Sequence, residues 1–209
     1  MQIVIATKNR GKVLEITGFF NGLSGKKAMP GKITWKTFQD FKDFPDVREG
    51  SKSFLENAIK KARKVAGYTG MVTLADDSGL EVDMLGGEPG VISSVYAGTC
   101  ASDGKNREKL LGKLKDVRDL EKRTARFICK MVLWDPGRGM LKTSDGVCEG
   151  RIGFIERGKG GFGYDPIFIP DGYEKTMAQL SQQEKNRISH RGKALKEMMV
   201  FLEDYLAAI

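Results

Sequence analysis

One short stretch constrains the fold more than any other: an apolar run that leads into two carboxylates, a hydroxyl and a glycine, Leu74-Ala-Asp-Asp-Ser-Gly-Leu80. The run Met71–Leu74 is typical of a short buried strand, which predicts that Asp76 and Asp77 emerge at its carboxyl end, where open α/β sheets bind ligands. Adjacent carboxylates are costly to bury unpaired, and a divalent cation such as Mg²⁺ would relieve that cost. A solvated turn with its bend at Gly79 explains the same residues, so other segments have to decide.

The composition is that of a globular protein with one sizeable core, as one large domain or two lobes. The chain has 209 residues, 40% of them hydrophobic. No apolar run approaches the about 20 residues that span a bilayer, and Met1–Lys8 looks like a strand rather than a signal peptide, so we expect no membrane partner. Cys100, Cys129 and Cys148 are odd in number and far apart, which predicts free thiols and a cytoplasmic location.

The formal net charge of +8 favours an anionic partner, either a nucleic acid or a phosphorylated small molecule, although it also fits plain solubility. The basic residues are spread along the chain in short clusters such as Lys60–Lys64. We interpret that cluster as a solvated helix face.

A polar segment, Thr7-Lys-Asn-Arg-Gly-Lys12, joins a predicted strand at Ile3–Ala6 to a helical repeat of apolar residues that starts at Val13. A helix N-terminus offers backbone N–H groups and a positive dipole end, which suit phosphate. The segment lacks the P-loop pattern, and an ordinary capped helix start explains it equally well.

The next part of the chain is predicted to form a loop at Leu23–Pro30 and a strand at Ile33–Phe38. A helix then begins at Ser53, where Ser53-Phe-Leu-Glu56 fits a capping box. Glu49 lies in the acidic loop before this helix and is a candidate metal ligand, although a single loop glutamate is commonly solvated.

Glycines and a proline within Glu81–Gly98 predict a long ordered loop beside the two aspartates. A helix is expected from Asp103 to Lys115 and a strand over Thr124–Trp134, followed by strands that run to about Ile155 and complete an antiparallel excursion. No repeat or linker is visible, so the sequence predicts no clean domain boundary.

A second glycine-rich segment, Gly158-Lys-Gly-Gly-Phe-Gly-Tyr-Asp-Pro166, would let the backbone approach a ligand closely. Phe162 and Tyr164 would supply flat faces on which a base can stack. Ser181-Gln-Gln-Glu184 fits another capping box, and the last helix opens near His190. This single histidine fits a surface residue or cap as readily as a ligand contact.

Six segments together resemble the inosine triphosphate pyrophosphatase family, which hydrolyses aberrant purine nucleoside triphosphates. They occur in the family's order and span residues 7–191, nearly the whole chain. The segments are Thr7–Lys12, Phe54–Ala58, Ala75–Leu80, Gly86–Val91, Gly161–Pro166 and Glu184–Arg191.

The resemblance implies an α/β fold with an elongated mixed β-sheet flanked by helices, and two lobes with a cleft between them. It implies Mg²⁺-dependent cleavage of ITP, dITP or XTP between the α and β phosphates, which gives the nucleoside monophosphate and pyrophosphate. It also implies a homodimer and no stable nucleic-acid partner.

The family's functional residues carry over onto matching positions. Asp77 would be the general base, supported by Asp76, and Glu49 and Asp77 would be the metal ligands. Arg191 would donate to the 6-oxo group of hypoxanthine or xanthine, which adenine lacks. The residues implied to bind substrate are Thr7, Lys8, Asn9, Arg10, Gly11, Lys12, Ser78, Phe162, Gly163, Tyr164, Asp165, Lys185, Ser189, His190 and Arg191.

Two segments depart from the family pattern. Gln179 stands where glutamate is expected, and Ile92-Ser-Ser-Val-Tyr96 stands where Tyr-Ser-Ala-Arg-Tyr is frequent. These departures concern a local polar network and a loop contact with a dimer partner more than the reaction.

Two other functions stay open at this point. Hydrolysis of a modified pyrimidine triphosphate would share the phosphate chemistry and differ in the base pocket. A nucleic-acid-binding module would use the positive charge and the aromatic glycine-rich loop. Such a module has no need of Asp76, Asp77 and Glu49, because carboxylates repel a phosphate backbone unless a metal intervenes.

Overall fold

The computed structural model describes residues 1–22, 33–50 and 52–207, so the expected loop at Leu23–Pro30 lies outside the described residues. The β-strands are β1 (Gln2–Ile5), β2 (Thr34–Lys36), β3 (Val72–Val82), β4 (Thr124–Asp135), β5 (Gly139–Ile152) and β6 (Phe168–Pro170). The α-helices are α1 (Arg10–Asn21), α2 (Phe54–Thr69), α3 (Asp103–Lys113), α4 (Gln182–Ile188) and α5 (His190–Ala207).

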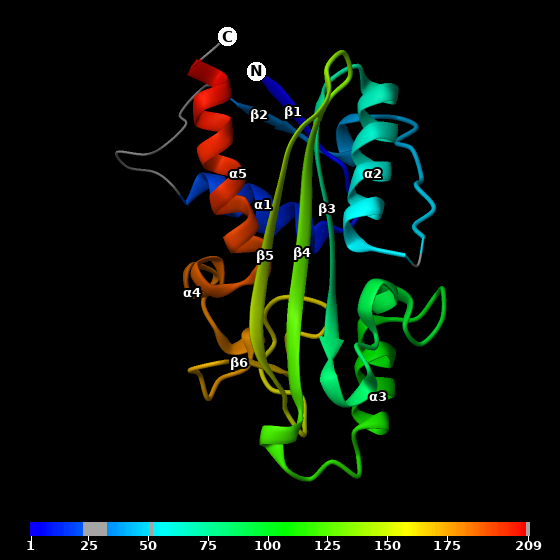
Figure 1. Cartoon of the computed structure of the whole chain (residues 1–209), viewed down its shortest axis with the longest axis vertical. Helices are drawn as coiled ribbons and strands as arrows, with labels where there is room; N and C mark the ends of the chain where they lie inside the picture. The colour runs from blue at the N-terminus through cyan, green and yellow to red at the C-terminus, as the bar shows by residue number, and fades with distance from the viewer. Residues whose placement is uncertain (23–32, 51, 208–209) are drawn as a thin grey trace. The chain divides into compact units, whose positions relative to one another are not determined.

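The strands form one sheet in the order β2-β1-β3-β4-β5-β6 (Figure 1). β1 pairs in parallel with both β2 and β3, whereas β5 and β6 pair antiparallel. The sheet is therefore mixed, and together with the helices it confirms the expected α/β class.

The chain divides into two compact units. The first comprises Met1–Asp77, Cys129–Gly146 and Arg191–Ile209, and the second comprises Ser78–Ile128 and Val147–His190. The divisions fall inside β3, β4 and β5 and after the first residue of α5, so no linker in the sequence marks them.

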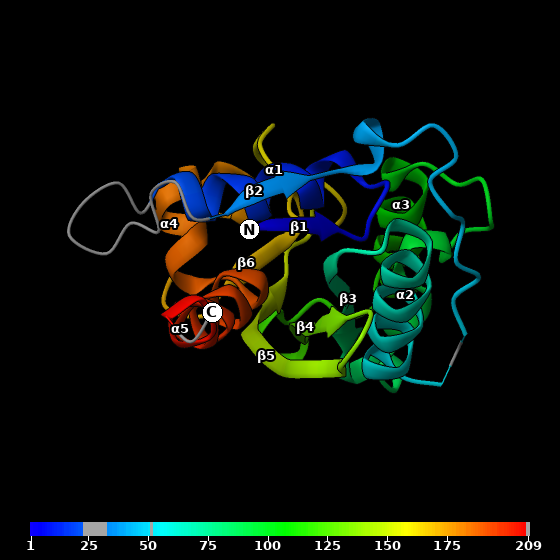
Figure 2. The ribbon, with the colours of Figure 1, turned by 90° about the horizontal axis from the view of Figure 1, so that it is seen from above.

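Helices cover both faces of the strands in the first unit (Figure 2). Ile3 and Ile5 of β1 pack with α1 and α5, whereas Val4 and Ala6 pack with α2. This division follows from the pleat of a strand, in which successive side chains point to opposite faces. The two faces of β3 are separated by the same rule.

Local signals set the ends of α2 as the sequence predicts. The Ser53 hydroxyl accepts a hydrogen bond from the Glu56 N–H at 3.2 Å, which caps the first turn. Gly70 ends the helix with φ of 66°, a conformation that glycine adopts without steric cost.

The core of the second unit lies between α3 and the adjoining parts of β3 to β6. Leu80, Leu110, Phe127, Ile152 and Phe168 are among its buried side chains. The segment predicted as one long loop at 81–98 is more regular than expected, because it holds the end of β3 and two 3₁₀ helices, η2 (Asp83–Leu85) and η3 (Gly90–Val95).

Cys129 and Cys148 are buried and Cys100 is exposed, and all three are free thiols. Within the described ranges, none of the helices combines the length and apolar character that crossing a membrane requires.

Candidate active site

The two adjacent aspartates lie inside β3. This strand continues through Asp76, Asp77 and Gly79, so the predictions of a strand end and of a bend at Gly79 were wrong. The register with β1 stops at the Ile5–Leu74 pair, and both aspartates lie beyond the end of β1. The other neighbour of β3, the long strand β4, accounts for the continuation, because it extends β3 past the point where β1 stops.

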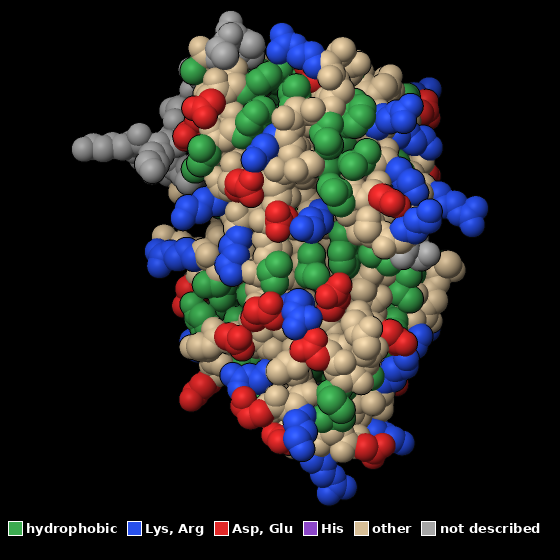
Figure 3. All heavy atoms as spheres, in the orientation of Figure 1, with side chains coloured by type: hydrophobic (Ala, Val, Ile, Leu, Met, Phe, Trp, Pro, Cys, Tyr) green, Lys and Arg blue, Asp and Glu red, His purple; other side chains and the backbone are tan. Residues whose placement is uncertain are grey.

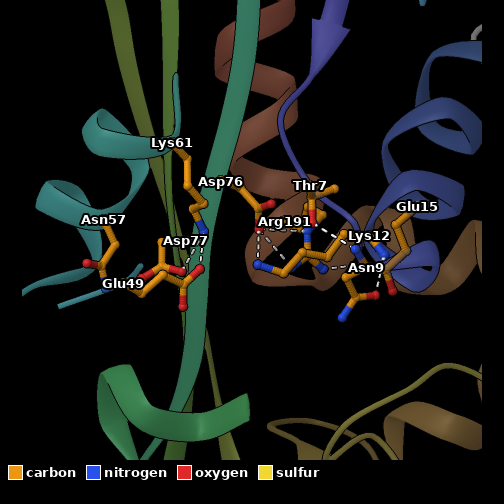
Figure 4. Close-up of polar contacts among 10 residues, drawn as sticks. All are labelled: Thr7, Asn9, Lys12, Glu15, Glu49, Asn57, Lys61, Asp76, Asp77 and Arg191. Carbon is orange, nitrogen blue, oxygen red and sulfur yellow. Dashed lines mark hydrogen bonds and ion pairs between the residues drawn. The ribbon is translucent and has the colours of Figure 1, made fainter. Parts of the chain in front are cut away.

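Asp76 points to the face that α1 and α5 cover (Figure 4). It is 1% exposed, and Lys12 Nζ and Arg191 Nη2 each lie 3.0 Å from its Oδ2 atom. Burial by itself raises the pKa of Asp76, but Lys12 and Arg191 outweigh it and hold that pKa well below its usual range. Asp76 is therefore an ionised anchor for two cations.

Arg191 is buried between two carboxylates. Its Nη1 atom donates to Glu15 of α1, while Nε and Nη2 donate to Asp76. Burial lowers the pKa of Arg191, and the charges of Asp76 and Glu15 reverse this and raise it. The guanidinium thus lies among acids of the first unit, and its expected contact with the base stays a prediction.

Asp77 points to the opposite face, toward α2 (Figure 4). Lys61 Nζ lies 2.8 Å from its Oδ1 atom, and Asn57 Nδ2 donates to its Oδ2 atom at 3.0 Å. Burial is the largest influence on Asp77 and raises its pKa above the ordinary value, with Glu49 adding to the rise and Lys61 opposing it. A carboxylate with a raised pKa suits a general base.

Glu49 reaches the same ammonium group, with its Oε1 atom 2.9 Å from Lys61 Nζ. The loop that carries Glu49 is fixed by Asn57, which accepts from the Gly50 N–H at 2.8 Å and donates to the Gly50 carbonyl at 3.0 Å. Two carboxylates therefore converge on one cation.

Sequence reasoning missed three residues of this arrangement: Glu15, Asn57 and Lys61. Lys61 was taken as part of a solvated face, yet it is only 7% exposed, so that interpretation was wrong for this residue. Burial lowers the pKa of Lys61, and the charges of Asp77, Asp76 and Glu49 raise it above its usual value. A signal was present, because Asn57 and Lys61 are four residues apart and border the apolar stripe of α2.

The donor set fits a hard divalent cation. Among the described residues, no group of three or more His, Cys, Asp or Glu side chains is placed to hold a metal ion. Mg²⁺ commonly takes only one or two carboxylates and completes its shell with water and substrate phosphates. The convergent oxygens of Glu49 and Asp77 meet that requirement.

The turn between β1 and α1 has the geometry of an anion site. The Thr7 hydroxyl accepts from the Asn9 N–H at 3.1 Å, and Asn9 Oδ1 accepts from the Lys12 N–H at 3.2 Å as the cap of α1. Arg10 begins the helix, and Lys8 pairs with Asp46 at 2.6 Å. The backbone N–H groups and dipole of this helix start favour a phosphate.

In the second unit, the glycine-rich segment closes on itself around Asp165. Its Oδ2 atom accepts from the Phe162 N–H at 2.9 Å and pairs with Lys185 Nζ at 2.5 Å. Lys185 Nζ also lies 5.3 Å from the centre of the Phe162 ring. Tyr164 differs from expectation, because its ring is 4% exposed and its hydroxyl donates to Ser93, so only Phe162 of the two rings remains as a stacking face.

His190 stacks on Phe127 within the second unit, with ring centres 4.7 Å apart. Ser189 precedes it as the C-cap of α4. Both side chains are buried. His190 is therefore not a surface residue, which was one of the two interpretations that the sequence left open.

The predicted residues fall into two groups. The first unit contains Thr7, Lys8, Asn9, Arg10, Gly11, Lys12, Glu49, Asp77 and Arg191. The second unit contains Ser78, Phe162, Gly163, Tyr164, Asp165, Lys185, Ser189 and His190. The residues predicted to hold phosphate and metal thus lie in the first unit, whereas the residues predicted to contact the base, apart from Arg191, lie in the second.

Known proteins resemble the chain in sequence and in fold over nearly their whole length. The sequence profile of the Ham1 family matches residues 3–201. A protein named dITP/XTP pyrophosphatase from Geobacter sulfurreducens is 46% identical to the chain, and the match covers 98% of this chain and 96% of that protein. A protein of the same name from Geobacillus kaustophilus is also 46% identical, and the match covers 94% of this chain and 92% of that protein. The HAM1 protein structure from Coxiella burnetii superposes with a TM-score of 0.82 at 40% identity, covering 98% of this chain and 99% of that chain. The structure of the Staphylococcus aureus Ham1 protein superposes with a TM-score of 0.81 at 38% identity, covering 98% of this chain and 100% of that chain. These matches confirm the resemblance found in the motifs, and the chain belongs to the Ham1 family.

Proposed function

We propose that the protein hydrolyses noncanonical purine nucleoside triphosphates, ITP, dITP and XTP, to the monophosphate and pyrophosphate with the help of Mg²⁺. The observation that carries this proposal is Asp77, a buried carboxylate with a raised pKa that Lys61 and Asn57 hold in place. The relatives named dITP/XTP pyrophosphatase support the substrate class.

The turn at the start of α1 would hold the triphosphate. An ammonium group has three donors, and Lys12 uses one of them on Asp76, so it can also contact a phosphate oxygen. The ion pair keeps Lys12 in one position, and the N–H groups of the first turn add donors aimed at the same anion. Charge that develops on the phosphate is thus met by groups already in place.

Asp77 would remove a proton from the attacking water. Its raised pKa brings it nearer to neutral pH, where a general base works best, while Lys61 and Asn57 fix the carboxylate. Glu49 and Asp77 would hold Mg²⁺, which when bound would neutralise phosphate charge and polarise the water.

The second unit would bind the nucleoside. Phe162 supplies a partly exposed ring for stacking, and the Asp165–Lys185 pair supplies polar groups beside it. Ser78, Ser189 and His190 are proposed to contact the substrate there. The 6-oxo group of the base is proposed to accept a hydrogen bond that the 6-amino group of adenine cannot accept.

The surface is compatible with a small-molecule substrate. On the face seen in Figure 3, lysine and arginine side chains are interspersed with acidic ones and form no continuous basic patch. We further propose a homodimer, which light scattering on the purified protein tests. We also propose a cytoplasmic location, which the free thiols support.

The decisive experiment is pyrophosphate release from ITP, dITP, XTP, GTP, ATP and a pyrimidine triphosphate, with Mg²⁺ and then with EDTA. Metal-dependent release from ITP, dITP and XTP far above the others is the expected result. Equal release from every nucleotide would overturn the base selectivity. Absence of release, with tight salt-sensitive nucleic-acid binding, would replace the proposal by the binding-module alternative.

A further inference from the structure

Helix α3 contacts the glycine-rich segment at Gly163 through two charged side chains. Asp103 Oδ2 accepts from the Gly163 N–H at 2.7 Å, and Arg107 Nη1 donates to the Gly163 carbonyl, also at 2.7 Å. Asp103 and Arg107 are four residues apart and therefore lie on one face of α3. Both backbone polar groups of Gly163 are thus taken by charged side chains of one helix.

Two features make this contact specific. Gly163 has φ of 60°, which places its N–H and carbonyl in an orientation that other residues rarely adopt. Arg107 is itself fixed, since its Nε atom lies 2.8 Å from Glu156 Oε1 and its side chain is only 15% exposed.

Other hydrogen bonds hold the residues of the segment on either side of Gly163. Gly160 donates to the Ala178 carbonyl at 3.1 Å, and Tyr164 donates through its hydroxyl to the Ser93 carbonyl at 2.8 Å. The Phe162–Asp165 turn closes on itself through the Asp165 N–H and the Phe162 N–H. Gly163 follows Phe162 directly, so the direction of the Phe162 ring depends on how Gly163 is held.

We propose that Asp103 and Arg107 are positioning residues for nucleoside recognition, which act by holding Gly163 and thereby Phe162 in the binding orientation. This inference rests on the proposed function and assigns part of its base recognition to α3. A segment held in advance loses less conformational entropy when a ligand binds, so the benefit appears as tighter nucleoside binding. Because that binding is the same in the ground state and the transition state, KM changes and kcat does not.

The test compares Asp103→Ala and Arg107→Ala with Lys105→Ala, which removes an exposed charge from the same helix. We expect KM for ITP and the Kd of IMP to rise about 5- to 20-fold in the first two variants, with kcat within about twofold of wild type. The Kd of pyrophosphate, which lacks a base, stays unchanged. Asp103→Asn and Arg107→Lys keep an acceptor and a donor for Gly163, and they restore most of the affinity.

A purely structural role gives a different pattern, with lower thermal stability and equal loss of IMP and pyrophosphate binding. That pattern overturns the inference, as do Asp103→Ala and Arg107→Ala variants that match Lys105→Ala in every constant. Wild-type protein that releases no pyrophosphate from ITP overturns the proposed function, and the inference with it. Wild-type activity with unaltered variants overturns the inference alone.

Discussion

Asp76 and Asp77 are neighbours in sequence, yet their carboxylates point to opposite faces of β3 and pair with different cations. Asp76 meets Lys12 and Arg191, whereas Asp77 meets Lys61. The pleat of one strand therefore separates a carboxylate with a lowered pKa from a carboxylate with a raised pKa. In the proposed reaction, Asp76 would hold the lysine that binds phosphate on one face, and Asp77 would accept the proton on the other.

Replacement of Asp77 by asparagine tests the base. Asn keeps the shape and the contact with Lys61 but cannot take a proton, so we expect kcat on ITP to fall about 10²- to 10⁴-fold. Urea unfolding checks that the fold survives. Asp43→Asn, which alters an exposed acid, is the matched control. Turnover close to wild type would remove Asp77 from the mechanism.

Replacement of Lys61 by methionine tests the charge beside the base. Lys61 lowers the pKa of Asp77 against the effect of burial, so its loss raises that pKa further. Activity is lost as pH falls through the pKa of the base, and we therefore expect the acid limb of the kcat/KM profile to move to higher pH. The loss of a buried partner should also cost about 3 kcal/mol of stability.

The control is Lys60→Met, which changes the adjacent and exposed lysine. A Lys61→Met profile that overlays both wild type and this control would show that the ion pair does not tune the base.

The low pKa of Asp76 makes a prediction about acid stability. In the unfolded chain the pKa of Asp76 is about 4. In the folded protein Lys12 and Arg191 lower that pKa, against the opposing effect of burial. Below about pH 4 the unfolded chain binds the proton more readily, so the contribution of Asp76 is present above that pH and is lost as pH falls toward the folded pKa. Urea titrations at pH 6, 5, 4 and 3 should show a steeper loss for wild type than for Asp76→Asn. If the free energy of unfolding falls equally with pH in the two proteins, Asp76 does not have a lowered pKa in the folded state.

Removal of Arg191 separates stability from base choice. Arg191→Ala leaves Asp76 and Glu15 buried without their shared cation, and we expect about 3 to 5 kcal/mol of lost stability by urea unfolding. The same variant should narrow the ratio of kcat/KM between ITP and ATP if its guanidinium also reads the 6-oxo group. An unchanged ratio would place base selection in the residues of the second unit.

Several elements could be predicted because their signals are local. Each of these signals lies within one continuous segment: the capping boxes at Ser53 and Ser181, the apolar stripe of α5 and the strand β4. The structure contains the expected helices and strand, and both helix caps are present. At Ser53 only the hydrogen bond to the serine hydroxyl is formed. A cap depends on residues three apart, and a stripe depends on helical spacing, so neither requires knowledge of the rest of the chain.

Other features depended on distant partners. β3 runs on through its aspartates because β4 pairs along it, and the segment 81–98 is ordered by contacts such as that of Ser93 with Leu80. Lys61 looked solvated because its neighbours in sequence are charged, whereas its burial depends on Asp77, which follows it by 16 residues.

The sequence by itself determined the family, the α/β class and the residue types at the site, because motifs and periodicity are written in short segments. Only the tertiary structure decided which cation each aspartate meets, that Arg191 lies between two acids, and that α3 holds Gly163. The reason is physical: the pKa of a buried charge, and the direction of a side chain, are set by groups brought close in space, and that proximity does not exist until the chain has folded.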